Sequence, residues 1–559
     1  MGPFGYESPF VNTFLGFFDS IASKLNNWQL ELANDFDKEF LLQGVQFGFK
    51  ISDLKDGDYD KVKHVEVANH KSTQLYASLV EKELKSQIVH GNYILASQRP
   101  LVVSPLGAIK KEGLNEVRII HDGSRPLGEA MNDYGGPQAV RYQTISDACA
   151  LARPGCFLAK IDLKSAYRSV PIHFSDYSLS GIKWWFEGEN SPSYLFDTRL
   201  PFGSNVGPSI FSRLTQSIRR MMSRKGFQNL VVYLDDFLIV ETTFQRCLDA
   251  QHVLISLLGS LGFQISWHKV VGPSQVVPFL GIVIDTKNCT LSLDDGKVAK
   301  LKAKLMVFKE KSRANKRQLQ SLAGSLNWAC QAVRGGRYFL RRVLDLVNRL
   351  KLGSHKCRLS KGFNLDVEWW ISALEKFNGT VYYRVCGSHV VNTDACLTGA
   401  GMFCGGDWAY INWKNDFPAA ESLHINNKEI LAVVCAAKRW AGLWRNCDVV
   451  VCTDSTVTKA VINKGTCRNE VVMTALRELF WLTVEYNFRL HAIHIPGSLN
   501  QLADAISRLH EPGQILQLHS LLRYWHHNVN VKVDCKSHMS PNAFQIVEPH
   551  ILRWSFRIS

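Results

Sequence analysis

Residues 230–240 read LVVYLDDFLIV, two apolar runs that flank a pair of adjacent aspartates. This pattern predicts two strands joined by a tight turn that holds Asp235 and Asp236. Two carboxylates at one tip form an oxygen-rich anionic group, which suits magnesium together with the phosphate oxygens of a substrate. Aspartate is also an ordinary turn residue. On that second interpretation the hairpin carries no chemistry.

A third carboxylate lies upstream in residues 157–167, which read FLAKIDLKSAY. An apolar strand is predicted to run into Asp162, and the aromatic Tyr167 follows it closely. Asp162, Asp235 and Asp236 would together hold two metal ions, which stabilise the attacking and leaving oxygens of an in-line phosphoryl displacement. The alternatives are that Asp162 caps a helix and that Tyr167 packs in a core.

These motifs, taken in this order, resemble the reverse transcriptases. The resemblance covers roughly residues 85–350, and several motifs in the right order are far more specific than any single one. It implies an α+β right-hand polymerase with fingers, palm and thumb. The motifs that carry it are YLDD at 233–236, the strand that ends at Asp162, LPFG at 200–203 followed by SNVGPSIF, VPFLG at 277–281, and the segments 110–111 and 117–120.

The resemblance implies roles for the residues of the polymerase site. Asp162, Asp235 and Asp236 would bind two catalytic Mg²⁺ ions, for which Mn²⁺ can substitute. Tyr167 would lie under the sugar of the incoming deoxynucleoside triphosphate. A 2′-hydroxyl would clash with its ring, which gives a steric reason to prefer deoxynucleotides.

The same resemblance implies further contacts to the incoming nucleotide. Lys110 and Arg118 would neutralise the triphosphate, which an arginine can also contact bidentately. Phe202, Gly203 and Tyr233 belong to the motifs that line the implied substrate site. Phe202 stands where retroviral enzymes carry a glutamine, which favours a relationship with other retroelements.

A second set of carboxylates lies beyond residue 385 in four separate segments. Apolar strands are predicted to end at Asp394 in VVNTDA and at Asp454 in VVVCTDS. Glu429 is predicted in the first turn of a helix that begins at Asn427, and Asp504 on a final helix after HIPGSLN. Each has an ordinary structural interpretation: a helix dipole favours Glu429, and the aspartates end strands or face solvent.

The order Asp-Glu-Asp-Asp on strand, helix, strand and helix resembles ribonuclease H over roughly residues 385–510. The resemblance implies an α/β domain with a mixed sheet that cuts the RNA strand of an RNA–DNA hybrid. Asp394, Glu429, Asp454 and Asp504 would bind two Mg²⁺ ions. The mobile histidine loop of some family members is not evident, because PGS at 496–498 occupies its place.

The charge of the chain predicts a polyanionic partner. The 559 residues carry a formal net charge of +15, and Lys297 to Lys361 contain 18 lysines and arginines against two acids. This run is expected to be a thumb that contacts the phosphates of a duplex, or else a solvated helical face. Residues 318–328 have helical spacing with their apolar positions in a core, and residues 351–366 are predicted to be a linker.

The cysteines and the hydropathy indicate where the protein acts. The 14 cysteines include no Cys-x-x-Cys pair and no close cluster, which favours a reducing intracellular compartment, the cytoplasm or the nucleus. No signal peptide and no apolar run of spanning length are seen, so no membrane partner is expected.

Together these observations predict a retroelement replication protein, an RNA-directed DNA polymerase followed by a hybrid-specific endonuclease. Its expected partners are an RNA template, a DNA primer, an RNA–DNA hybrid and deoxynucleoside triphosphates. The predicted segments are an N-terminal extension of unknown role (1–85), fingers and palm (86–290), a basic thumb and connection (291–384), the ribonuclease H-like domain (385–510) and a C-terminal tail (511–559).

Segments 425–429, 493–497 and 503–508 look most like DIRS- or Ngaro-type retrotransposons, with Ty3-type elements and pararetroviruses as close relatives. Two alternatives differ in chemistry. One is a domesticated protein that binds nucleic acid with decayed catalysis, which the intact carboxylate sets disfavour. The other is a template-independent or RNA-primed cellular polymerase, which the appended nuclease disfavours.

Overall fold

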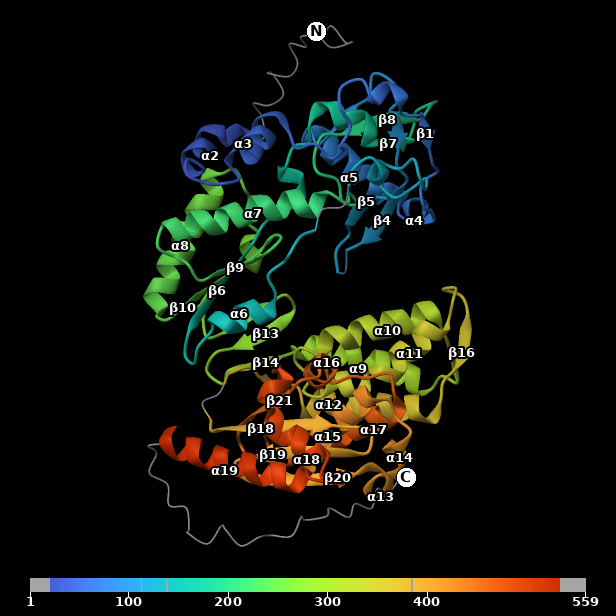
Figure 1. Ribbon diagram of the computed structural model, residues 1–559. Coiled ribbons are helices and arrows are strands. Elements are labelled where there is room, and N and C mark those ends of the chain that lie inside the picture. Colours follow the sequence, from blue (N-terminus) through green and yellow to red (C-terminus); the bar gives the residue numbers. More distant parts are fainter. Residues whose placement is uncertain (1–20, 112, 137–138, 384–385, 533–559) are drawn as a thin grey trace. The chain divides into compact units, whose positions relative to one another are not determined.

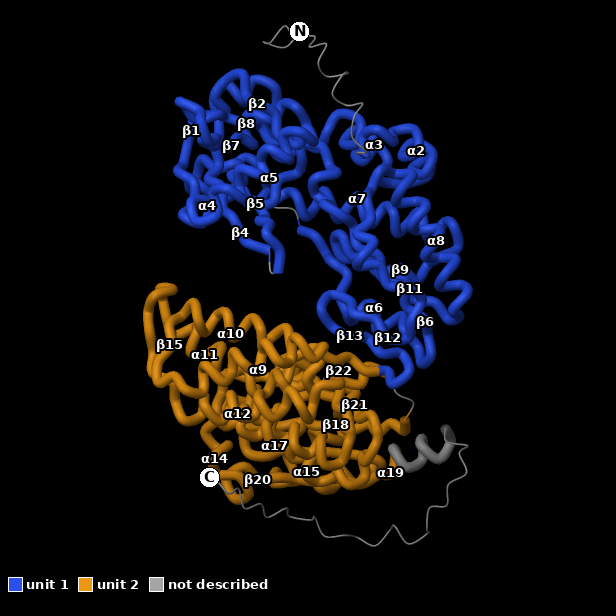
Figure 2. Tube along the Cα trace, turned by 180° about the vertical axis from the view of Figure 1, so that it is seen from behind, with its two compact units in different colours: residues 1–289 blue, residues 290–559 orange. Residues whose placement is uncertain are grey.

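The computed structural model describes residues 21–532 except 112, 137–138 and 384–385 (Figure 1). The chain divides into two compact units, residues 1–289 and residues 290–559 (Figure 2). None of the helices within the described residues is long and apolar enough to cross a membrane.

The first unit is built around a four-stranded antiparallel sheet with the strand order β11-β6-β10-β9. Alternate side chains of the two central strands, among them Ile161 and Phe237, join one core with the two long helices α7 and α8. The intervening side chains, among them Leu158 and Leu238, are buried as well, so both faces of the sheet are covered and the strands are apolar along most of their length. The elements are β6 (Phe157–Asp162), β9 (Leu230–Tyr233), β10 (Asp236–Glu241), β11 (Val271–Ser274), α6 (Ile145–Leu151), α7 (Gly207–Arg224) and α8 (Phe244–Ser260).

A second sheet and a hairpin complete the first unit. The five-stranded sheet has the order β1-β3-β7-β8-β2, and β4 pairs antiparallel with β5 as a separate hairpin. A core beneath them includes Val80 and Leu84 of α5. The elements are β1 (Val65–Glu66), β2 (Tyr93–Leu95), β3 (Val102–Val103), β4 (Leu106–Lys110), β5 (Val117–His121), β7 (Gly181–Trp184), β8 (Ser193–Asp197), α4 (Lys71–Leu75) and α5 (Ala77–Val89).

The described N-terminal residues pack into the core of the four-stranded sheet. Helices α2 (Leu25–Glu31) and α3 (Lys38–Phe47) bury Trp28, whose indole N–H donates to the carbonyl of Leu261 at 3.0 Å. Asp35 accepts hydrogen bonds from the Arg220 guanidinium of α7 at 2.8 and 2.7 Å. This part of the extension is therefore an integral element of the first unit.

The predicted strand turn at 277–281 is confirmed. β12 (Val276–Phe279) and β13 (Ile282–Asp285) form an antiparallel hairpin. Leu280 and Gly281 make the turn with positive φ values of 46° and 81°.

The second unit begins with a helical layer. The predicted helix over 318–328 is confirmed as α10, and it buries its apolar positions Leu319, Leu322 and Leu326. Two short strand pairs join the layer, β15 with β16 and β14 with β17. The elements are α9 (Asp295–Lys309), α10 (Lys316–Ala329), α11 (Arg341–Arg349), α12 (Lys361–Lys376), β14 (Thr290–Ser292), β15 (Arg313–Asn315), β16 (Lys356–Arg358) and β17 (Thr380–Val381).

The predicted linker at 351–366 is wrong, because this stretch contains β16 and the start of α12. Asp366 of α12 is only 2% exposed, and it forms ion pairs with Arg342 at 2.6 Å and Arg477 at 3.4 Å. These pairs tie the helical layer to α17 (Glu470–Glu485) within the second unit. The polar character of the stretch reflects buried ion pairing as well as exposure.

A mixed five-stranded sheet forms the rest of the second unit, and the predicted mixed sheet is confirmed. Its order is β20-β19-β18-β21-β22, in which β18 is antiparallel to β19 and parallel to β21. The elements are β18 (Ser388–Ala395), β19 (Gly399–Cys404), β20 (Asp407–Asn412), β21 (Asp448–Thr453), β22 (Arg489–His494), α13 (Trp413–Asp416), α14 (Pro418–Glu421), α15 (Ile425–Trp440), α16 (Thr456–Lys464), α17 (Glu470–Glu485), α18 (Gln501–Ser507) and α19 (Gln514–Lys532).

Strand β19 shows how helices cover both faces of this sheet. Met402 lies in the core that contains α15, whereas its neighbour Phe403 packs with Ile506 of α18. Successive side chains of a strand point to opposite faces, so α15 and α18 lie on opposite sides. A Cβ at Gly401 would be 2.2 Å from the Ala503 carbonyl, so glycine permits the close approach of α18.

Candidate active sites

The predicted aspartate hairpin exists, and it meets the predicted Asp162 strand. Asp236 begins β10 and lies directly opposite Asp162, the last residue of β6, in the antiparallel register. Asp235 occupies the turn after Leu234, whose φ is 51°, and its carbonyl accepts from the Leu163 N–H at 3.1 Å. All three aspartates therefore lie at one end of the central sheet.

Two lysines partly neutralise this acidic group. The Lys269 ammonium donates to Asp162 at 2.9 Å, and Lys160 pairs with Asp236 at 2.9 Å. Burial raises the pKa of Asp235, with the charges of Asp236 and Asp162 adding to it. Burial also raises the pKa of Asp236, although Lys160 opposes that shift. Carboxylates that repel one another in this way gain from a divalent cation.

The predicted sugar-contacting residue belongs to an aromatic stack. The ring of Tyr167 lies 5.2 Å from that of Phe202 at an interplanar angle of 11°, and 5.2 Å from that of Phe211. Arg118 places its guanidinium 5.7 Å from the centre of the Phe202 ring. The structure thus brings the predicted residues Tyr167, Phe202 and Arg118 into one contiguous row. Tyr233 packs instead against Tyr142, with ring centres 5.4 Å apart.

Gly203 is required by its surroundings. Its φ is 130°, and a Cβ there would lie 1.9 Å from the carbonyl oxygen of His121. The His121 N–H in turn donates to the Phe202 carbonyl at 3.0 Å. This contact docks the 200–203 loop on β5, whose Arg118 is exposed, as is Lys110 on β4.

A cavity of about 540 Å³ lies beside this docked loop. Its lining includes Gly107 and Ile109 of β4, Asp122 after β5, and Gly203. His70 pairs with Asp122 at 3.0 Å on this wall. The cavity therefore adjoins the loop and the strands that carry Phe202, Lys110 and Arg118.

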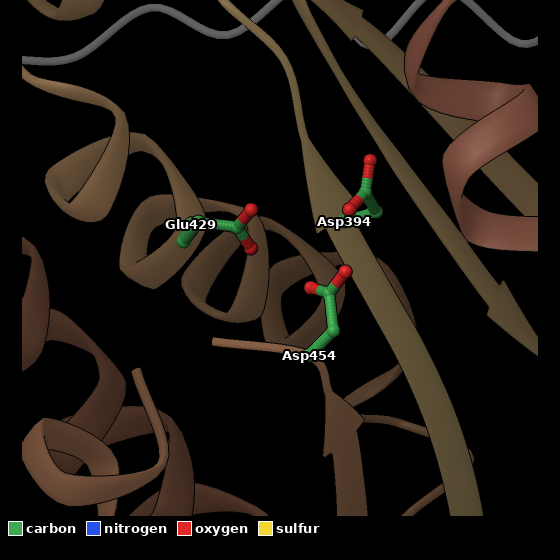
Figure 3. A group of neighbouring side chains, drawn as sticks. All are labelled: Asp394, Glu429 and Asp454. Atoms are coloured by element: carbon green, nitrogen blue, oxygen red, sulfur yellow. The ribbon is translucent and has the colours of Figure 1, made fainter. Parts of the chain in front are cut away.

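Three carboxylates of the second predicted set converge tightly. One ligand oxygen from each of Asp394, Glu429 and Asp454 lies within 4.8 Å of the others, and the side chains point toward one another (Figure 3). Asp394 and Glu429 are buried, at 5% and 7% exposure, and Asp454 is exposed. Among the described residues this is the one group of three with metal-site spacing, so the polymerase aspartates are less tightly gathered.

The electrostatics of this cluster favour a bound cation. Burial raises the pKa of Glu429 to about 8, and the charges of Asp394 and Asp454 contribute. Burial also raises the pKa of Asp394 to about 6, although the Ser507 hydroxyl, which donates to it at 2.7 Å, opposes the shift. The buried Oε2 of Glu429 has no hydrogen-bond partner. Hard oxygen ligands with an unsatisfied buried oxygen fit a magnesium ion.

Asp504 stands beside the cluster rather than within its 4.8 Å group. Its side chain is 47% exposed and accepts from the Arg508 guanidinium at 3.0 Å. Its charge still contributes to the raised pKa values of Asp394 and Glu429. The structure therefore brings three of the four predicted carboxylates together and places the fourth within electrostatic reach.

The predicted position of Glu429 in a first helical turn is wrong. Helix α15 begins at Ile425, and the His424 side chain caps it by accepting from the Asn426 N–H at 3.2 Å. Glu429 therefore lies in the second turn, where it faces Asp394. The helix dipole acts mainly on the first turn, so the ordinary structural reason for an acid at a helix start does not apply here.

The sequence did not single out three partners of these carboxylates, namely Lys160, Lys269 and Ser507. Lys160 and Ser507 lie within three residues of a predicted aspartate in the sequence, which is a usable signal. Lys269 is 107 residues from Asp162, and only the fold brings the two together.

Comparisons with known proteins agree with this geometry. The family model described as reverse transcriptase (RNA-dependent DNA polymerase) matches residues 109–284. The Gag-Pol polyprotein of avian reticuloendotheliosis virus is 26% identical over 190 residues, which are 34% of this chain and 16% of that protein. The Gag-Pol polyprotein of koala retrovirus is 26% identical over 184 residues, which are 32% and 11%. The chain thus spans less than a fifth of these relatives.

A solved structure shares the fold. The foamy viral protease-reverse transcriptase in complex with an RNA/DNA hybrid matches with a TM-score of 0.50 at 16% identity, covering 84% of this chain and 63% of that one. Residues 109–284 therefore match the reverse transcriptase family, and the relatives found by sequence are retroviral Gag-Pol polyproteins. The predicted fold class is confirmed for the reverse transcriptase fold of helices and sheets, and the second unit has the predicted α/β architecture with a mixed sheet.

Proposed function

We propose that this protein is an RNA-directed DNA polymerase with a hybrid-specific ribonuclease H, and that it copies the RNA of a retrotransposon. The observation that carries the polymerase is the pairing of Asp236 with Asp162 beside Asp235, inside the segment 109–284 that matches the reverse transcriptase family. The motifs of the chain make a DIRS- or Ngaro-type element the preferred source.

In the polymerase site, Asp162, Asp235 and Asp236 would hold two Mg²⁺ ions, or Mn²⁺ in their place. These ions supply charge stabilisation for the attacking and leaving oxygens of phosphoryl transfer. Lys160 and Lys269 hold two of the carboxylates in place and limit their mutual repulsion. The aspartates are thereby kept at one end of the sheet in a geometry ready for ligands.

The substrate side of this site selects a deoxynucleoside triphosphate. Lys110 and Arg118 offer exposed cations to the triphosphate. Tyr167 packs against both Phe202 and Phe211, and these two contacts restrict the movement of its ring away from a 2′-hydroxyl. A rigid ring makes the steric rejection of ribonucleotides effective. A deoxyribose lacks the 2′-hydroxyl and is therefore accepted.

In the nuclease site, Asp394, Glu429 and Asp454 would hold the metal ions, with Asp504 as the fourth ligand once it leaves Arg508. Two bound ions would activate water and stabilise the leaving oxygen. Ser507 orients Asp394 through its hydrogen bond. The 2′-hydroxyls of RNA distinguish the strand to be cut, so a hybrid is cleaved and duplex DNA is spared.

The binding partners follow from this chemistry. The RNA template, the DNA primer and their hybrid would contact the basic run from Lys297 to Lys361 through phosphates, because such contacts release counterions. The foamy viral protein of similar fold was solved with an RNA/DNA hybrid. We assign fingers and palm to 86–290, thumb and connection to 291–384 and nuclease to 385–510. The action of the protein would be in the cytoplasm or the nucleus.

One assay tests both activities. Purified protein is incubated with magnesium, deoxynucleoside triphosphates and a labelled primer on a labelled RNA template, and both strands are followed on a gel. We expect an extended primer and a shortened template. Binding of the primed template without extension or cleavage would instead support the alternative of a domesticated protein that only binds nucleic acid.

A further inference from the structure

One lysine of the nuclease unit is buried next to a metal-binding residue. Lys428 precedes Glu429 on α15 and is only 2% exposed. Its ammonium donates to the carbonyl of Leu397 at 2.6 Å and to the carbonyl of Glu421 at 2.9 Å. Both acceptors are backbone carbonyls, one in a turn and the other at the end of the short helix α14.

A buried ammonium needs a structural reason. Lysine is rarely buried fully, because removing its charge from water is costly unless hydrogen bonds compensate. A leucine or methionine would fill an apolar space without that cost. The N–H donors of Lys428 are therefore the reason for a lysine at this position. Their two acceptors show which segments the side chain connects.

The two carbonyls belong to segments that carry the metal cluster. Leu397 lies in the turn that follows β18, the strand of Asp394, and leads into β19. Glu421 ends α14, just before α15, which carries Glu429. One side chain thus links the turn behind Asp394 to the entry of the helix that presents Glu429.

The turn that follows β18 also makes hydrogen bonds with Trp413 and within itself, so a further hydrogen bond from Lys428 of α15 can fix its position. The Trp413 indole donates to the Cys396 carbonyl at 3.1 Å, and the Gly399 N–H donates to the Cys396 sulfur at 3.1 Å. Asp394 and Glu429 repel one another when no cation is present. Core packing joins β18 to α15, and the hydrogen bonds of Lys428 add a polar link that helps to keep the two carboxylates within reach of one ion.

We propose that Lys428 is a positioning residue of the nuclease. Through the carbonyls of Leu397 and Glu421 it sets the separation of Asp394 and Glu429, and thereby the affinity of the cluster for divalent metal ions. This inference rests on the proposed nuclease function. Lys428 does not contact the metal, and its effect passes through the turn and the helix.

The test is a magnesium titration of the full chain carrying Lys428→Met, with hybrid cleavage and the magnesium-dependent rise in melting temperature as two separate readouts of metal affinity. This variant keeps the length and the apolar stem but loses the donors. Partners that orient metal ligands typically contribute 10–100-fold to metal affinity or activity, so the magnesium concentration for half-maximal cleavage should rise roughly tenfold. Primer extension by the same protein should be unchanged.

Lys438→Met is the matched control. Lys438 lies on the same helix and is mostly buried. It pairs with Glu478 at 2.6 Å and not with the turn after β18 or with the end of α14. Its variant should cleave with the wild-type magnesium midpoint. Lys428→Gln, which retains one donor, should shift the midpoint by less than Lys428→Met.

An unchanged midpoint in Lys428→Met, with or without a lower maximal rate, would overturn the inference, since a purely structural role removes active protein without altering metal affinity. If the methionine variant melts below the assay temperature, the glutamine variant decides in the same way. A wild-type protein that cleaves no hybrid in magnesium or manganese would instead end the proposed nuclease function.

Discussion

Replacing Glu429 by glutamine should stabilise the metal-free protein while ending RNA cleavage. Burial raises the pKa of Glu429 from 4.5 to about 8, and Asp394 and Asp454 contribute. Between these two pH values the folded protein binds more protons than the unfolded protein. The free energy of unfolding therefore falls as the pH rises from about 4.5 to about 8.

The size of the effect follows from that shift. A pH of 7 is about 2.5 units above the ordinary pKa of this carboxyl. At 1.36 kcal/mol per unit, keeping Glu429 protonated in the folded protein costs about 3 kcal/mol. Glutamine removes this cost but weakens the hydrogen bond that Glu429 accepts from the Ala395 backbone, which is worth about 1 kcal/mol. The net gain of ~2 kcal/mol raises the melting temperature of a domain this size by about 4–8 °C.

Thermal unfolding in EDTA at pH 5 and pH 7.5 measures this gain in stability. The unfolding transition that shifts when magnesium is added is assigned to the nuclease domain. The difference between Glu429→Gln and wild type should be small at pH 5 and much larger at pH 7.5. Magnesium should raise the melting temperature of the wild type and leave the variant nearly unchanged. Glu485→Gln, at the far end of α17 in the same unit, serves as the control and should behave as wild type. A variant less stable than wild type at pH 7.5, or a difference independent of pH, would refute the reasoning.

Three further outcomes are expected. Tyr167→Ala should raise ribonucleotide relative to deoxynucleotide incorporation in primer extension, because its ring no longer blocks a 2′-hydroxyl; an unchanged ratio would leave Tyr167 a core aromatic. Neutralising several cations between Lys297 and Lys361 should flatten the salt dependence of hybrid affinity by about 0.9 per lost phosphate contact on a log–log plot; an unaltered slope would show a solvated face. Ser507→Ala should raise the magnesium midpoint of cleavage roughly tenfold without slowing polymerisation, because Asp394 loses its orienting donor, and a wild-type midpoint would contradict that role.

Local sequence patterns were sufficient for the elements that carry the acids. The apolar runs around Asp235 and Asp236 predict a hairpin because strand pairing across a short turn is a local property. The strands before Asp162, Asp394 and Asp454 are likewise short apolar runs that end in a polar residue. Strand, helix and loop assignments at these positions need little beyond nearest neighbours.

The residues that tune the sites depend on contacts far apart in the chain. Lys269 reaches Asp162 only because β11 and the preceding turn return to β6. The buried pairing of Asp366 with Arg477 made a polar stretch look like a linker, since burial of a charge is not visible in composition. The start of α15 was placed late because His424, an uncommon cap, begins the helix earlier than the Asn427 signal suggested.

The most direct test of the central claim separates the two sites in one protein. Asp235→Asn and Glu429→Gln are compared with wild type on a primed RNA template in magnesium, with both strands labelled. We expect Asp235→Asn to lose primer extension and still cut the RNA of a preformed hybrid, whereas Glu429→Gln should extend the primer and leave the RNA intact. Extension by Asp235→Asn at near the wild-type rate would contradict the assignment of the aspartate hairpin as the polymerase centre.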